Sequence, residues 1–128
     1  MELPQELEVW YIIPAIRKEL ALAMKNNGLK QVEIAKKLGL TKSAITQYIN
    51  EKRGNEVKLN EKIKLEVAIS ANKINSQIDA LREIQYLINV TREEKIVCQV
   101  HRDKDNSLSQ CNVCFEKPLN LINIGERK

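Results

Sequence analysis

A glycine between two short apolar stripes is the feature that most constrains the fold of this chain. Gly39 suits the left-handed backbone position that ends a helix, and the hydroxyl of Thr41 is placed to cap a helix that follows. The small side chain of Ala35 at the crossing allows two helix axes to approach closely there. The apolar residues on either side follow helical spacing, as Ile34, Ala35 and Leu38, and then Ile45, Tyr48 and Ile49. Residues 28–54 are therefore predicted to form two short helices that meet at a sharp, fixed angle.

The same spacing leaves a polar outer face on the second helix, formed by Lys42, Ser43, Thr46 and Gln47. Short hydroxyls and a carboxamide are side chains that can sit against base edges in the major groove of DNA, and glutamine pairs well with adenine. Lysine can reach either a guanine edge or a phosphate. These four residues are therefore predicted to read bases.

Further polar residues flank this face at positions suited to the DNA backbone. Gln31 begins the first helix, where free amides favour a phosphate, and Thr41 lies at the start of the second. Asn50, Lys52 and Arg53 follow the second helix and are predicted to contact phosphates. The alternative is a helical hairpin from another kind of domain, with polar residues that are only solvated.

The segment resembles the phage-repressor class of helix-turn-helix (Cro/cI, or XRE). The residues that carry the resemblance are Gln31, Ile34, Ala35, Leu38, Gly39, Thr41, Ile45, Gln47, Lys52 and Arg53. Residues 3–20 are similar to the amino-terminal domain of archaeal predicted transcriptional regulators, some of which carry a thiamine-related effector domain. That effector domain is not expected in this chain. The resemblance implies a regulator that binds double-stranded DNA in a sequence-specific manner.

Charge and hydropathy agree with such a function without establishing it. The formal net charge is +4, and the basic excess lies mainly in residues 1–54, where nine Lys and Arg face six Asp and Glu. No apolar run approaches the length of a membrane span. The acidic start lacks the basic stretch and apolar segment of a signal peptide. We therefore expect a cytoplasmic protein with no membrane partner.

A further helix is predicted before the two short ones. Its apolar residues are Val9, Ile12, Ile13, Ile16, Leu20 and Met24, and Asn27 with Gly28 can end it. Because proline lacks an amide hydrogen, Pro14 predicts either a kink or a short first helix followed by one that begins near Pro14. Trp10 is expected to be a core or interface residue.

The region after the two short helices is also predicted to be helical. Asn60 can cap a helix that runs toward Ile74, and a stripe of apolar residues continues at Ile78, Leu81, Ile84, Leu87 and Ile88. This stripe either folds back on the amino-terminal helices or forms the seam of a homodimer. Repressor-type proteins often place two recognition helices on successive turns of DNA, which favours the homodimer. The charged run from Arg92 to Lys95 is expected to be a solvated face.

The carboxyl-terminal region contains all three cysteines and the single histidine of the chain. Cys98 and His101 form one pair, and Cys111 and Cys114 form another, each with two residues between its members. This spacing predicts a four-ligand site for structural zinc, with an iron–sulfur cluster as the alternative. A disulfide, buried apolar cysteines and a cysteine nucleophile are the competing interpretations.

These observations predict an all-helical protein with three parts. Residues 1–56 are expected to be the DNA-binding domain, residues 57–92 a helical dimerisation segment, and residues 93–128 a metal-binding knuckle. No phosphate-binding glycine loop or catalytic carboxylate pair is recognisable, so we do not expect an enzyme, and no small-molecule effector is identifiable. The alternative function is an interaction protein, resembling an antitoxin or a polymerase-recruiting factor, whose knuckle binds a protein partner.

Overall fold

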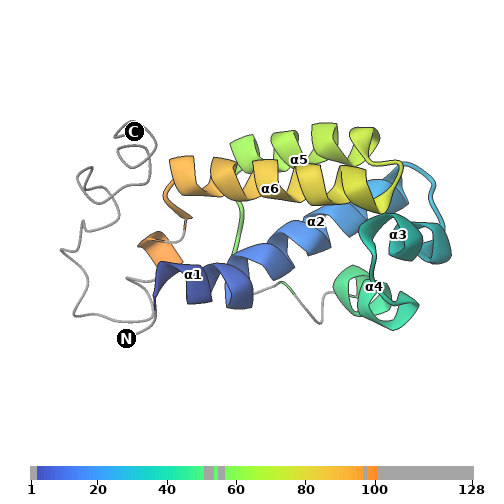
Figure 1. The fold of residues 1–128 in the computed structure, drawn as a ribbon, viewed down its shortest axis with the longest axis horizontal. Coiled ribbons are helices and arrows are strands. Elements are labelled where there is room, and N and C mark those ends of the chain that lie inside the picture. The colour runs from blue at the N-terminus through green and yellow to red at the C-terminus, as the bar shows by residue number, and fades with distance from the viewer. Residues whose placement is uncertain (1–2, 51–53, 55–56, 97, 101–128) are drawn as a thin grey trace, which may run out of the picture.

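A computed structural model describes residues 3–50, 54, 57–96 and 98–100, and all regular elements within these residues are helices (Figure 1). The elements are α1 (Pro4–Leu7), the π-helix η1 (Glu8–Ile12), α2 (Ile13–Asn26), α3 (Gln31–Leu38), α4 (Lys42–Ile49), α5 (Glu61–Lys73) and α6 (Gln77–Glu93). The predicted all-helical class is confirmed for this part of the chain. None of the described helices is both long and apolar enough to cross a membrane.

The helical stretch before the two short helices changes its hydrogen-bonding pattern next to Pro14. The amide of Ile13 donates to the carbonyl of Glu8, five residues back, which closes the π-turn. Since Pro14 cannot donate, the chain widens there, and α2 begins at Ile13 with the proline in its first turn. The prediction of a new helix near Pro14 is therefore confirmed.

The π-turn also explains why Val9 departs from the apolar stripe of the predicted helix. Its side chain is 59% exposed, because the wider turn shifts the residues before Pro14 out of phase with the stripe on α2. Trp10 is 51% exposed, so it is not a core residue of this chain, and its alternative place at an interface stays a prediction. Its ring meets Tyr11 edge to face, with the ring centroids 6.5 Å apart.

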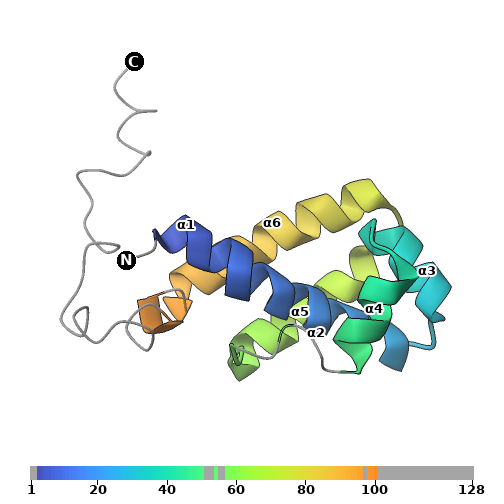
Figure 2. The same cartoon turned by 90° about the horizontal axis from the view of Figure 1, so that it is seen from below.

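The helix α2 lies at the centre of the fold, where it contacts α3, α4, α5 and α6. Ile16 and Leu20 of α2 are completely buried. Figure 1 shows α2 beneath the pair formed by α5 and α6, and Figure 2, seen from below, shows α2 crossing in front of them with α3 and α4 at one end of the molecule. One hydrophobic core therefore joins the two short helices to the helices that follow them.

The helices α5 and α6 form a hairpin. The side chain of Asn60 accepts from the amide of Ile63 at 2.9 Å, which confirms the predicted cap of α5, and Ser76 caps α6 in the same way. Tyr86 of α6 donates to the carboxylate of Glu66 on α5. The region that was predicted only to be helical therefore consists of two consecutive helices.

The apolar stripe of α6 has different surroundings at its two ends. Leu87 and Ile88 are 0% and 7% exposed, whereas Ile78 and Leu81 are 63% and 59% exposed. The predicted fold back onto the amino-terminal helices is therefore confirmed for the carboxyl-terminal half of the stripe. The residues nearer the α5–α6 turn remain on the surface of the chain.

An ion pair ties the end of α6 to the start of the chain. The guanidinium of Arg92 donates from Nε to Glu8 Oε2 at 2.8 Å and from Nη2 to Glu8 Oε1 at 2.9 Å. Glu8 is buried, and its hydrogen bond raises the pKa of Arg92. The expectation that the charged run after Thr91 is only a solvated face is therefore wrong for Arg92, because the partner lies 84 residues away in the sequence.

Candidate nucleic-acid interface

The turn between α3 and α4 has the geometry that Gly39 predicts. Gly39 adopts a φ of +68°, in the left-handed region, and the amide of Leu40 donates to the carbonyl of Ala35 at 2.9 Å. A Cβ atom on Gly39 would lie 3.3 Å from the side chain of Gln77, at the start of α6. The glycine therefore both ends α3 and allows close approach of α6.

The start of α4 is capped as predicted. Thr41 has an extended backbone, and its Oγ1 accepts from the amide of Ala44 at 3.0 Å. This bond satisfies one of the amides that have no partner within the helix. The first turn of α4 is therefore held in place by a residue next to the turn glycine.

The inward faces of both short helices are also confirmed. Every predicted inward residue is at most 8% exposed, namely Ile34, Ala35, Leu38, Ile45, Tyr48 and Ile49. Since these residues fix the rotation of each helix about its axis, they also decide which residues of α4 can face outward.

The four predicted base-reading residues differ in exposure. Lys42 and Ser43, in the first turn of α4, are exposed, whereas Thr46 and Gln47 are partly buried. The amino-terminal turn of α4 is consequently the most accessible part of this face. It presents a cation and a hydroxyl group side by side, a combination able to bind phosphates and base edges.

A hydrogen bond that the sequence did not predict joins α3 to α4. The hydroxyl of Thr46 lies 2.8 Å from Gln31 Oε1 and 3.0 Å from the carbonyl oxygen of Lys42, and it can donate its proton to one of them at a time. When it donates to Gln31, the Nε2 group of that side chain keeps two donors for another partner. Neither residue type nor spacing indicates such a contact between different helices.

Gly54, which follows α4, lies close to α2. Asn50 ends α4 and is exposed, whereas Lys52 and Arg53 lie outside the described residues. Gly54 has a φ of +75°, and a Cβ atom on it would lie 2.6 Å from the carbonyl oxygen of Pro14. A glycine at this position is therefore required for the chain to cross α2 so closely.

The predicted metal ligands lie mainly outside the described residues. Of the four, only Cys98 is described. It is partly buried and packs against the hydrophobic core. His101, Cys111 and Cys114 lie beyond the described part, and the residues that are described contain no cluster of three or more His, Cys, Asp or Glu able to hold a metal ion.

Comparison with known proteins agrees with this geometry. Residues 20–54 match the family model described as Helix-turn-helix (HTH_3). No significant match was found among curated proteins or among solved structures. The matched residues run from α2 to the glycine that crosses it, and they include the capped turn between α3 and α4. Residues 20–54 therefore carry a phage-repressor-like helix-turn-helix, which is a DNA-binding type of segment.

Proposed function

We propose that this protein is a transcriptional regulator that binds double-stranded DNA in a sequence-specific manner. The observation that carries the proposal is the fixed rotation of α4, whose buried residues leave Lys42 and Ser43 exposed at its capped start. In helix-turn-helix proteins, the amino-terminal residues of the second helix contact base edges in the major groove. The accessible end of α4 is the end that this mode of binding uses.

We assign base reading and backbone contact to separate groups of residues. Lys42, Ser43, Thr46 and Gln47 are assigned to base edges, and the backbone contacts are assigned to Gln31, Thr41, Asn50, Lys52 and Arg53. The bond between Thr46 and Gln31 supports a common role for α3 and α4, because it holds the Gln31 carboxamide beside the reading face. Phosphate contacts of this kind set the position of a protein on DNA, whereas base contacts set its sequence preference.

We also propose that the protein binds a two-fold-symmetric operator as a homodimer, with residues 57–92 as the dimerisation segment. The exposed apolar residues Ile78 and Leu81 support this arrangement. Two recognition helices on successive turns of DNA supply more binding energy than one and contact a longer stretch of DNA sequence. Sedimentation equilibrium of the full chain, alone and on a symmetric duplex, measures the stoichiometry.

For the carboxyl-terminal region we propose a structural zinc site with Cys98, His101, Cys111 and Cys114 as ligands, and an iron–sulfur cluster is the alternative. The support is the spacing of these residues and the presence of both thiolates and imidazole. Anaerobic purification followed by absorption spectroscopy and metal analysis separates the two. One zinc per colourless chain supports the first proposal, and brown protein with iron and sulfide supports the second.

Selection from random duplexes tests the DNA-binding proposal, because it needs no knowledge of the operator. The full chain should recover a preferred sequence. Replacing Gln47 with Ala should relax the preference at one position, whereas Lys52→Gln should weaken binding to all sequences and reduce the slope of log affinity against log salt by about one.

Lys73→Gln is a matched control, since Lys73 is an exposed lysine in the last turn of α5. It should leave both sequence preference and salt slope unchanged. Failure to recover any preferred duplex, or an unchanged preference in the Gln47 variant, would contradict the respective assignment.

A further inference from the structure

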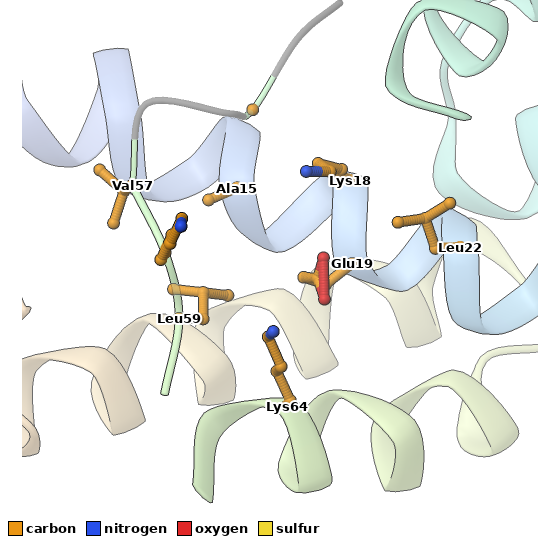
Figure 3. A pocket seen from close by; sticks show the side chains of 9 residues that line it. Ala15, Lys18, Glu19, Leu22, Val57, Leu59 and Lys64 are labelled. Atoms are coloured by element: carbon orange, nitrogen blue, oxygen red, sulfur yellow. The ribbon is translucent and has the colours of Figure 1, made fainter. Parts of the chain in front are cut away.

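A cleft of about 580 Å³ lies between α2, the described residues 54 and 57–59, and the start of α5. Figure 3 shows side chains from α2 and α5 extending toward each other across it. Ligand pockets in proteins commonly measure about 300–1,000 Å³, so this cleft can accept a small molecule. Its lining residues are Ala15, Lys18, Glu19, Leu22, Gly54, Val57, Lys58, Leu59 and Lys64.

The charge in the cleft is predominantly positive. Lys18, Lys58 and Lys64 line it together with a single acidic residue, Glu19. Within the described part of the chain, Lys58, Lys64 and Glu19 take part in no ion pair. Lys58 and Lys64 therefore come from different segments and form no ion pair with another described residue, while Glu19 supplies the single carboxylate among the described residues that line the cleft.

The remaining walls of the cleft are largely apolar. Leu59 is 4% exposed and forms part of the hydrophobic core, and Val57 packs against that core. Ala15 and Leu22 contribute further apolar surface from α2. Pockets that bind small molecules typically combine apolar walls with a few polar groups that fix the orientation of the ligand.

We propose that this cleft binds a small organic anion with an apolar body, whose carboxylate, sulfonate or phosphate group lies near Lys58 and Lys64. The apolar part would lie against Leu22, Val57 and Leu59. No sequence motif indicates such a site, because its lining comes from three segments that only the tertiary structure brings together.

The location gives such a ligand contact with both halves of the molecule. Gly54 lies close to the backbone of Pro14 in α2, and Lys64 belongs to the hairpin that follows. A bound molecule would therefore stabilise the packing of residues 57–59 between α2 and α5. Binding to the cleft does not depend on the proposed function in DNA recognition.

Two fluorescent probes test the proposal on the full chain without DNA. Anilinonaphthalene sulfonate has an apolar body and an anionic group, and phenylnaphthylamine has the same body without the charge. The anionic probe should bind with one molecule per chain. Lys58→Gln and Lys64→Gln should each weaken this binding by about three- to tenfold, since each removes one charged partner at a partly solvated site.

The neutral probe should bind equally to the wild type and to both variants, and Lys73→Gln should bind the anionic probe as the wild type does. Lys58 and Lys64 are both exposed, so neither substitution should disturb folding. In amide NMR spectra, the anionic probe should shift signals from Ala15, Leu22 and Leu59.

Three results would overturn the proposal. The first is an equal loss of binding in the Lys73 variant, and the second is equal binding of the two probes. The third is a set of shifts confined to Leu65 and Ile69, exposed apolar residues of α5 that do not line the cleft. Each of these would leave the DNA-binding proposal unaffected, because no DNA is present in the experiment.

Discussion

The two helix pairs of this protein, α3–α4 and α5–α6, both carry apolar stripes at helical spacing, but the spacing has different consequences in them. In α3 and α4, every residue of the predicted stripe is buried. In α6, the same type of stripe is buried at Leu87 and Ile88 and exposed at Ile78 and Leu81. Spacing alone therefore identifies a face of a helix without showing whether another element covers it.

The difference follows from how each pair is joined to its surroundings. A left-handed glycine and a threonine cap fix the angle between α3 and α4, and both stripes lie in the common core with α2. In the hairpin α5–α6, long-range contacts such as Arg92 with Glu8 contribute to which part of α6 is covered. Local signals therefore determine the angle between α3 and α4, whereas contacts with distant residues determine which part of α6 is covered.

The largest effect is expected within α6 itself. Leu87→Ala should lower the free energy of unfolding by about 2–5 kcal/mol, because Leu87 is completely buried. Leu81→Ala should change it by about 0.5 kcal/mol or less if the residue stays on the surface. Urea denaturation measures both. A large loss in the Leu81 variant that depends on protein concentration would show that a second chain covers this residue.

A smaller loss is expected when the link between α6 and the start of the chain is removed. Arg92→Ala leaves the buried carboxylate of Glu8 without its partner and should cost about 1–3 kcal/mol, since the guanidinium itself is half exposed. Lys62→Ala removes an exposed ion pair with Glu94 and should cost about 0.5 kcal/mol or less. Equal losses in the two variants would show that the contact between Arg92 and Glu8 contributes no more to stability than an exposed ion pair.

The turn between α3 and α4 tests the role of local signals. Gly39→Ala should cost about 1–2 kcal/mol, because the residue must keep a φ of +68°. Gly39→Asn should cost less, since asparagine tolerates the left-handed region better. Thermal unfolding of the three proteins gives the comparison, and an Ala variant as stable as the wild type would argue against the requirement for a left-handed residue.

The smallest expected effect is a pH dependence of stability that distinguishes the start of α6 from the start of α4. The backbone amide of Asn75 donates to Asp79 at the start of α6, and this bond lowers the pKa of Asp79 below its ordinary 3.8, with a further contribution from Arg82. Because the folded-state pKa is the lower one, the stabilisation is present above about pH 3.8 and is lost as the pH falls through the depressed value.

The difference in urea midpoint between the wild type and Asp79→Asn should therefore shrink as the pH is lowered from about 5 toward 3. The start of α4 is capped by the neutral hydroxyl of Thr41, so the difference between the wild type and Thr41→Ala should stay constant over the same range. If the difference between the wild type and Asp79→Asn did not change with pH, the ionised carboxylate of Asp79 would not contribute to stability as proposed.

The sequence by itself determined the elements that depend on neighbouring residues. The turn at Gly39, the caps at Thr41 and Asn60, and the new helix near Pro14 all follow from short-range backbone geometry and hydrogen bonding. The inward faces of α3 and α4 follow from the same local rules, and with them the outward position of Lys42 and Ser43.

Only the tertiary structure decided the features that depend on distant partners. The division of the α6 stripe, the bond between Gln31 and Thr46, and the lysine-lined cleft each combine segments that are separate in the sequence. The physical reason is that helical periodicity fixes the direction of a side chain relative to its own helix. What that side chain meets depends on how the helices pack together.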